Sequence, residues 1–280
     1  MIKLFITIFF AFSAFNLFAY EANDSIFDAD PYFILMGEAD DAISAEKWDI
    51  AAARLNDALS IKPDHPSNAL LLNNLASVYI NLGQDSLALA SYDKALDIAP
   101  SMITIINSKG RLLLKKGRDH EAFYTFENAI AIDSLSTDAR FYHGIMALYA
   151  GNKVIAEQDF GVLNSIAPYS LDTAIALSSL YSLTGRDREA IPYLKRIIEH
   201  EPSPEYYAML AGCYLELEEL TDASAIIAEG LNIYPTDPEL YYYRAWLRRD
   251  QYMTDDAHAD ARKAIELGAS PTKVNDLFTK

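Results

Sequence analysis

Few of the side chains that commonly perform chemistry are grouped in this sequence. The five histidines are scattered: His65, His120, His143, His200 and His258. No two of them have the spacing of metal ligands, and no HExxH, GxSxG, GxGxxG or P-loop pattern occurs. The acidic pairs Asp40–Asp41 and Glu218–Glu219 resemble general acid–base pairs, but solvated helix faces explain them better among 40 acidic residues. We therefore expect no catalytic residues, no metal and no cofactor.

The single cysteine and the charge restrict the possible partners further. One cysteine, Cys213, excludes an intramolecular disulfide framework and a cysteine-based zinc cluster. It lies in a predicted helix among apolar residues, where a buried structural thiol is the simpler interpretation and a reactive thiol the alternative. The formal net charge of −17 repels a phosphate backbone, so nucleic acid is not an expected partner.

The densest basic cluster is an exception in this acidic chain. Its members are Lys109, Arg111, Lys115, Lys116 and Arg118. Arg111 and Lys115 are one helical turn apart and therefore share a face. Since an arginine fork binds carboxylates well, this cluster suggests recognition of an acidic segment. The alternative is that these charges are simply solvated.

The elements that would position such side chains follow from a repeat of about 34 residues. Alanine recurs at positions 51, 88, 122, 156, 190, 223 and 257, in steps of 37, 34, 34, 34, 33 and 34. A small residue stands twelve positions before each of these alanines, and a proline often stands twelve positions after it. Self-similarity at this period indicates a stacked array of short units.

Each unit is predicted to be two antiparallel helices. In the second unit, apolar spacing predicts a first helix over residues 69–82, and Gly83 ends it because glycine adopts a left-handed conformation without a steric penalty. Asp85 is the expected N-cap of the second helix, as are Asp119 and Asp187 in other units. Small residues at the helix crossing allow close approach, and large ones such as Tyr92 and Phe126 fill the remaining volume.

The repeated small residues with a terminal proline resemble the tetratricopeptide repeat family, and Leu72, Leu75, Tyr79 and Gly83 add to the match in the second unit. The resemblance implies an all-α fold, a right-handed α-solenoid of about seven helix-turn-helix repeats. The expected boundaries are a solenoid over residues 32–270, with repeats starting near 32, 69, 103, 137, 171, 204 and 238, and a short C-terminal capping helix over 271–280.

The beginning of the chain has the composition of a secretory signal peptide. Lys3 precedes an apolar run from Leu4 to Phe18, and cleavage is expected after Ala19. An uncleaved membrane anchor is the alternative, although about 15 apolar residues fall short of the roughly 20 that span a bilayer. Residues 20–31 are expected to form an acidic, flexible leader. We therefore expect an exported protein, periplasmic or secreted, without stable membrane insertion after cleavage.

In the family that the chain resembles, the first helix of each unit lines a concave groove that binds peptide segments. Transferred to this sequence, the resemblance implies these groove residues: Asn73, Ser77, Asn107, Arg111, Lys115, Phe141, Ile145, Tyr149, Tyr242 and Trp246. Their chemistry suggests a protein or peptide segment with an acidic part and an apolar anchor. The alternative interpretation is that the aromatic side chains belong to the core between repeats. His143, in the same predicted helix as Phe141, is expected to be a packed or rim residue.

Some members of the family hold a terminal carboxylate in a clamp of lysine, asparagine and arginine. Asn74 matches the middle asparagine, but Met36, Asp40, Thr104 and Ser108 stand at the flanking positions. The clamp is therefore absent.

Three functions remain after these exclusions. The first is a non-catalytic, exported scaffold that binds another protein in its groove. The second is a structural or chaperone-like accessory subunit of an envelope assembly or secretion complex, and the third is an enzyme with an unrecognised site. End-to-end self-association is compatible with the first two.

Overall fold

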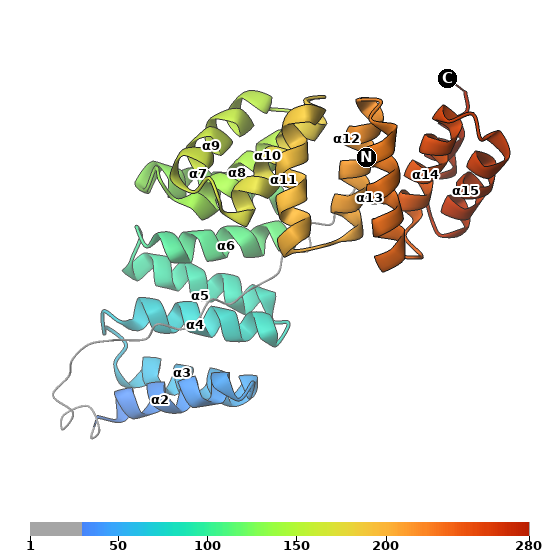
Figure 1. Cartoon of the computed structure of the whole chain (residues 1–280). Helices are drawn as coiled ribbons and strands as arrows, with labels where there is room; N and C mark the ends of the chain where they lie inside the picture. The colour runs from blue at the N-terminus through green and yellow to red at the C-terminus, as the bar shows by residue number, and fades with distance from the viewer. Residues whose placement is uncertain (1–29, 280) are drawn as a thin grey trace. The chain divides into compact units, whose positions relative to one another are not determined.

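The computed structural model describes residues 30–279, which form helices and no strands (Figure 1). The predicted signal peptide and most of the predicted leader lie outside the described residues. No described helix is long and apolar enough to cross a membrane. The chain divides into two compact units, which we call unit 1 (up to Ala99) and unit 2 (from Pro100 onward).

Unit 1 contains two helical hairpins. They are formed by α2 (Pro31–Ser44), α3 (Trp48–Ile61), α4 (Asn68–Asn81) and α5 (Asp85–Ile98). In each hairpin the two helices are joined by a short turn and pack closely together. The core is built from the inward faces of α2, α3 and α4, with Tyr32 and Leu71 among its largest buried side chains.

Unit 2 contains five further hairpins of the same kind and a cap. Its helices are α6 (Ile103–Lys115), α7 (Asp119–Ile132), α8 (Thr137–Tyr149), α9 (Lys153–Ile166), α10 (Leu171–Leu183), α11 (Asp187–His200), α12 (Pro204–Glu216), α13 (Leu220–Ile233), α14 (Pro238–Asp250), α15 (Thr254–Glu266) and α16 (Pro271–Asp276). Each even-numbered helix from α6 to α14 begins a hairpin, and α16 packs against α15. The prediction of an all-α fold made of stacked hairpins is confirmed.

The turns inside the hairpins use a left-handed residue, as the glycines predict. Gly83, Gly117, Gly151 and Gly185 all have positive φ between 70° and 85°. The other hairpins place a side chain in the same conformation: Glu46, Glu218 and Tyr252 have φ between 55° and 61°. The close fit of the hairpin imposes this geometry even where the residue type disfavours it.

The predicted N-caps of the second helices are wrong by one residue. Asp85, Asp119 and Asp187 are the first helical residues, and the residues before them cap no backbone N–H with their side chains. The reason is that the left-handed residue already reverses the chain, so the helix starts sooner. A carboxylate in the first turn still interacts favourably with the positive end of the helix dipole.

The crossing between the two helices of a hairpin explains the recurring small residues. The alanines that define the period, such as Ala88 and Ala122, are fully buried. At Gly110 an added Cβ would lie 2.7 Å from the ring of Phe126, and at Gly144 it would lie 2.5 Å from the ring of Phe160. Glycine therefore stands where the facing residue is phenylalanine, which confirms the predicted packing of small against large residues.

The longer junction between the first two hairpins is held together by polar contacts. The hydroxyl of Tyr32 donates to Oδ1 of Asn68 at 2.9 Å. The amide of Asn68 in turn donates to the carbonyls of Lys62 and Pro63, at 2.6 and 2.8 Å. Asn68 thus links the junction between the two hairpins to Tyr32 at the start of α2.

Candidate functional site

The candidate groove residues lie on the first helices of the hairpins, where the resemblance places them. Asn73 and Ser77 are on α4 in unit 1, and the other eight are on α6, α8 and α14 in unit 2. The side of unit 2 formed by α6, α8, α10, α12 and α14 is called its first-helix face below.

In unit 1 the two candidate residues are half-buried and bond locally. The hydroxyl of Ser77 donates to the carbonyl of Asn73 at 3.2 Å. The amide of Asn73 lies 3.5 Å from Oδ1 of Asn74. The hydroxyl of Ser77 and the amide nitrogen of Asn73 are thus engaged within α4, and Oδ1 of Asn73 is buried, so the two side chains offer a weak docking surface by themselves.

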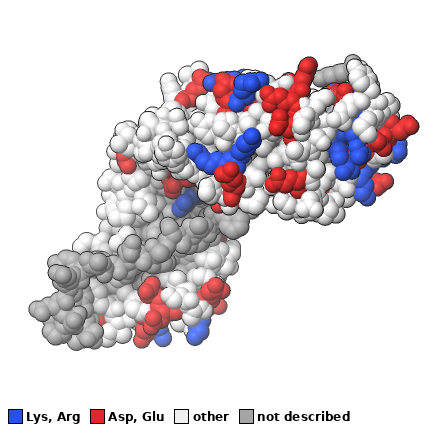
Figure 2. Space-filling view, viewed as in Figure 1, with Lys and Arg blue, Asp and Glu red and all other residues white. Residues whose placement is uncertain are grey.

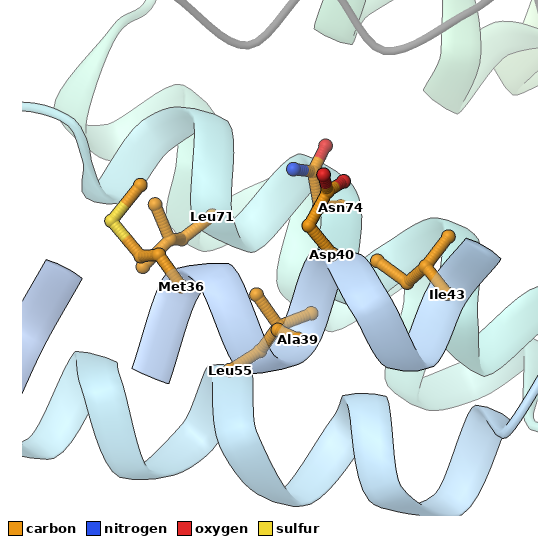
Figure 3. A pocket seen from close by; sticks show the side chains of 7 residues that line it. All are labelled: Met36, Ala39, Asp40, Ile43, Leu55, Leu71 and Asn74. Carbon is orange, nitrogen blue, oxygen red and sulfur yellow. The ribbon is translucent and has the colours of Figure 1, made fainter. Parts of the chain in front are cut away.

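A small hollow opens beside them between α2, α3 and α4 (Figure 3). Its walls are mainly apolar, and Asp40 and Asn74 stand side by side at its rim. Its lining residues are Met36, Ala39, Asp40, Ile43, Leu55, Leu71 and Asn74. Because Asp40 supplies a negative charge where a carboxylate clamp needs a positive one, the hollow is unsuited to a terminal carboxylate.

A larger cleft of about 600 Å³ lies in unit 1, lined by residues from α3, α4 and α5. Leu59, Leu72 and Tyr79 give it an apolar floor, and Leu87 and Ile98 are 48% and 44% exposed beside it. The resemblance to a groove formed only by first helices did not predict it. Its signal in the sequence is a second helix, residues 85–98, whose outer side carries apolar residues.

In unit 2 Arg111, a member of the predicted basic cluster, already has partners within the chain. Nη1 of Arg111 lies 3.4 Å from Oδ2 of Asp138, and Arg111 also donates to the hydroxyl of Ser108. Lys115 is exposed at the end of α6. The pairing of Arg111 weakens the argument that this cluster awaits an acidic partner.

Four of the candidate residues are buried and contribute to packing. Asn107 is 5% exposed and donates to the hydroxyl of Ser136 at 3.2 Å. Phe141 and Ile145 are buried on α8, and Tyr242 is buried under the cap formed by α16. For these four, the alternative of core residues describes their surroundings better than an open groove does.

Tyr149 and Trp246 are the aromatic candidates with accessible surface. Tyr149 is 43% exposed at the end of α8. Trp246 is half-buried on α14, stacked on Tyr243 with ring centroids 6.2 Å apart. The guanidinium of Arg249 lies 5.7 Å from the centroid of the Trp246 ring. These side chains give the first-helix face of unit 2 aromatic area at two separate places.

Sequence reasoning missed a buried polar cluster between α8 and α9. Asp159 is 4% exposed, and its two oxygens accept from Nη1 of Arg140 at 2.7 Å and from Nδ1 of His143 at 2.6 Å. The ring of His143 also lies 4.2 Å from that of Phe123, so the interpretation of this histidine as a packed residue fits its surroundings. The missed signal was an aspartate on the inner side of a second helix.

Burial makes the thiol of Cys213 a poor nucleophile. Cys213 is 2% exposed, and removal from water raises the pKa of its thiol to about 12. Within residues 30–279 no three histidine, cysteine or acidic side chains lie together in a way that could hold a metal ion. The structural interpretation of Cys213 therefore fits its surroundings.

Comparison with known proteins agrees with this architecture. Residues 36–103 match the tetratricopeptide repeat family model. These residues of the chain carry tetratricopeptide repeats. Repeats of this family are widely used for binding other proteins, which makes a scaffold the general class of function.

A curated relative of the chain is the human protein O-mannosyl-transferase TMTC1. It is 25% identical over 199 residues, which are 69% of this chain and 19% of TMTC1. The chain thus spans about a fifth of the length of that relative. At this coverage the similarity carries no information about transferase activity here.

Three solved structures show the same fold. A tetratricopeptide repeat protein from Parabacteroides merdae has a TM-score of 0.64 at 23% identity, covering 89% of this chain and 98% of its own. PilF of Pseudomonas aeruginosa has a TM-score of 0.66 at 18% identity, and the match covers 77% of this chain and 97% of PilF. PilW, a type IV pilus biogenesis factor, has a TM-score of 0.62 at 22% identity, and the match covers 78% of this chain and 98% of PilW.

Proposed function

We propose that this protein is a non-catalytic scaffold that binds a segment of another protein on the first-helix face of unit 2. The observation that carries this proposal is aromatic surface at Tyr149 and Trp246, on helices whose other sides form the core. Aromatic side chains supply much of the contact energy in protein interfaces. Four of the ten candidate residues are buried, so the binding surface is narrower than the sequence implies.

The test is capture of the native partner by variants of the full chain. Crosslinked co-purification from the native host, followed by mass spectrometry, identifies the proteins bound by the wild type. Tyr149→Ala combined with Trp246→Ala is expected to reduce capture at least tenfold, since each buried aromatic anchor contributes about 1–2 kcal/mol or more. Tyr124→Ala is the matched control, because Tyr124 is 58% exposed on the second helix α7.

The same experiment has a clear contrary outcome. Undiminished capture by the double variant, with loss of capture by Tyr124→Ala, would place binding on the other side of the hairpins. Circular dichroism of each variant establishes that the helices remain intact, so that loss of binding is not loss of fold.

A second candidate is an accessory subunit of an envelope assembly, and the cleft in unit 1 favours it. That cleft involves the second helices α3 and α5, so it would bind a partner away from the first-helix face. PilF and PilW have this fold, and PilW is a pilus biogenesis factor. If the partner binds in this cleft, Leu87→Asp is expected to abolish capture of the native partner, because Leu87 lines the cleft. If the partner binds only to unit 2, capture by this variant should be unchanged.

Export is part of both proposals and rests on the N-terminal sequence. A positively charged start and an apolar run of about 15 residues are typical of a signal peptide. N-terminal sequencing of the protein from its native host is expected to give a mature chain that begins at Tyr20. An intact Met1 in a cytosolic fraction would contradict export.

A further inference from the structure

The larger cleft of unit 1 reaches the junction between its two hairpins. Pro63 and Asn68 belong to this junction, and both line the cleft. Asn68 is 1% exposed, and its amide donates to the carbonyl of Pro63 at 2.8 Å. Hydrogen bonds therefore hold this end of the cleft in place, and its walls continue along α3, α4 and α5.

The first described residue of the chain is held near this end. The carboxylate of Asp30 pairs with Lys62, the residue directly before Pro63. The same carboxylate accepts from the backbone N–H of Tyr32 at 3.0 Å. The hydroxyl of Tyr32 in turn donates to Asn68. Whatever precedes Asp30 in the chain is therefore tethered beside the cleft.

The sequence directly before Asp30 contains two adjacent apolar residues in an acidic setting. Residues 20–29 read YEANDSIFDA, with three carboxylates, no basic residue and the neighbours Ile26 and Phe27. An extended chain covers about 3.3–3.6 Å per residue, so Phe27 and Ile26 reach roughly 10–14 Å from Asp30. A short tether also gives them an effective concentration on the order of millimolar at a nearby surface.

The cleft has the size and the surface to take these two side chains. Its volume is about 600 Å³, within the range of pockets that bury small ligands. Leu87 and Ile98 are half exposed beside its apolar floor, so an apolar occupant would remove them from water. Lys94 and Asp97 are exposed on its wall with opposite charges. Apolar contact rather than charge therefore selects the occupant.

We infer that residues 20–29 fold back onto unit 1 and place Ile26 and Phe27 in this cleft. This segment is favoured over a partner protein as the occupant because it is tethered at the end of the cleft. The inference goes beyond the proposed scaffold, which uses unit 2, and does not depend on it. A partner that enters the cleft must first displace the segment, which makes the predicted leader a competitor of such a partner.

The experiment uses the protein purified from its native host and measures how fast a maleimide modifies Ala90→Cys. Ala90 is exposed and lines the cleft, whereas the natural Cys213 is 2% exposed and reacts slowly. Adding Ile26→Asp and Phe27→Asp is expected to raise the modification rate at least fivefold, because the cleft is then uncovered.

Two controls separate uncovering of the cleft from other causes of a faster reaction. Ala22→Asp with Ser25→Asp adds the same charge to the segment but keeps both apolar side chains, so it should leave the rate of Ala90→Cys unchanged. Tyr124→Cys, at a position 58% exposed on α7, should react equally fast with and without Ile26→Asp and Phe27→Asp.

A second measurement locates the segment directly. Phe27→Cys combined with Ala90→Cys is expected to form an intramolecular disulfide under mild oxidation. A disulfide-linked dimer would place the segment on a second copy and overturn the inference. Equal maleimide rates for Ala90→Cys with and without the two aspartates would overturn it as well, as would an intact mass showing that the purified protein lacks residues 26 and 27.

Discussion

The fourth and seventh hairpins, α8–α9 and α14–α15, bury a carboxylate at the same position and neutralise it differently. Asp159 is held by Arg140 and His143, whereas Asp260 is held by Arg244 and by a second arginine of α14, at 2.6–2.8 Å. His143 and Arg244 occupy equivalent places before the small residue of the crossing. The difference shows that one position of the hairpin can bury a carboxylate with different donor side chains around it.

The helix crossings of these two hairpins also differ, in the size of the residues that face each other. The fourth brings Gly144 against Phe160, while the seventh has Ala245 and Ala261 at the equivalent positions. The smaller pair leaves room for the cap, since Ala245 and Ala261 belong to a cluster with Val274 of α16. Figure 2 shows Lys and Arg next to Asp and Glu in the part of unit 2 that contains this hairpin.

The largest effect in this comparison is expected from removing the buried carboxylates. Asp159→Ala should lower the free energy of unfolding by about 3–5 kcal/mol, because it leaves Arg140 buried without its partner. Asp260→Ala should cost less, since Arg244 and Arg248 are 31% and 28% exposed against 13% for Arg140. Urea unfolding of both variants measures the difference, and an equal or reversed order would contradict the interpretation.

The crossings provide the next prediction. Gly144→Ala should destabilise by about 1–3 kcal/mol, because the new methyl group would lie 2.5 Å from the ring of Phe160. Ala245→Gly should cost only about 0.5–1 kcal/mol, the usual cost of glycine in a helix. Thermal melting tests both, and Gly144→Ala combined with Phe160→Leu should recover part of the loss. A stabilised Gly144→Ala variant would mean that the hairpin is not tightly closed.

A smaller effect is expected at the ends of the first-helix face. Lys273→Met removes the pair with Glu239, whose side chains are 34% and 41% exposed, so the loss should be about 0.5–1 kcal/mol and smaller at high salt. Lys263→Met is the control, because its pair with Glu266 is more exposed and should contribute almost nothing. Equal melting temperatures for the two variants would show that the rings of Tyr242 and Tyr243, which lie beside Nζ of Lys273, add nothing to its site.

The smallest effect is a pH dependence at Glu205, which lies between the two hairpins in the chain. Burial raises the pKa of Glu205 above 4.5, so ionisation begins to favour the unfolded chain above pH 4.5 and has its full effect above the folded-state pKa. Glu205→Gln should therefore raise the melting temperature at pH 7 by about 1 °C, and the two proteins should converge below pH 4.5. A variant that is less stable than the wild type at pH 7 would show that Glu205 has a stabilising partner.

Most of the fold follows from local patterns of the sequence. The small residues at the crossing, the large residues facing them and the left-handed glycines recur at a fixed period, and all of them depend on contacts inside one hairpin. The exceptions were also local: Asp85 and its equivalents begin their helices one residue earlier than the capping rule suggested. The left-handed residue before them accounts for that shift.

The candidate site was less predictable, because it depends on contacts between hairpins. Helical spacing placed Arg111 and Phe141 on the first-helix face, but burial of Phe141 and pairing of Arg111 with Asp138 depend on how neighbouring helices approach. Asp159 was missed for a different reason: its partners Arg140 and His143 lie on the other helix of its own hairpin, and only the packing of these two helices brings the side chains within hydrogen-bonding distance.

By itself the sequence determined the helical hairpin, its period and the places of its small and left-handed residues, since each is dictated by sterics within about 34 residues. Only the tertiary structure decided which charges are compensated. Ion pairing needs atoms within a few ångströms of one another, and residues as far apart in the chain as Glu239 and Lys273 meet only after the helices have packed.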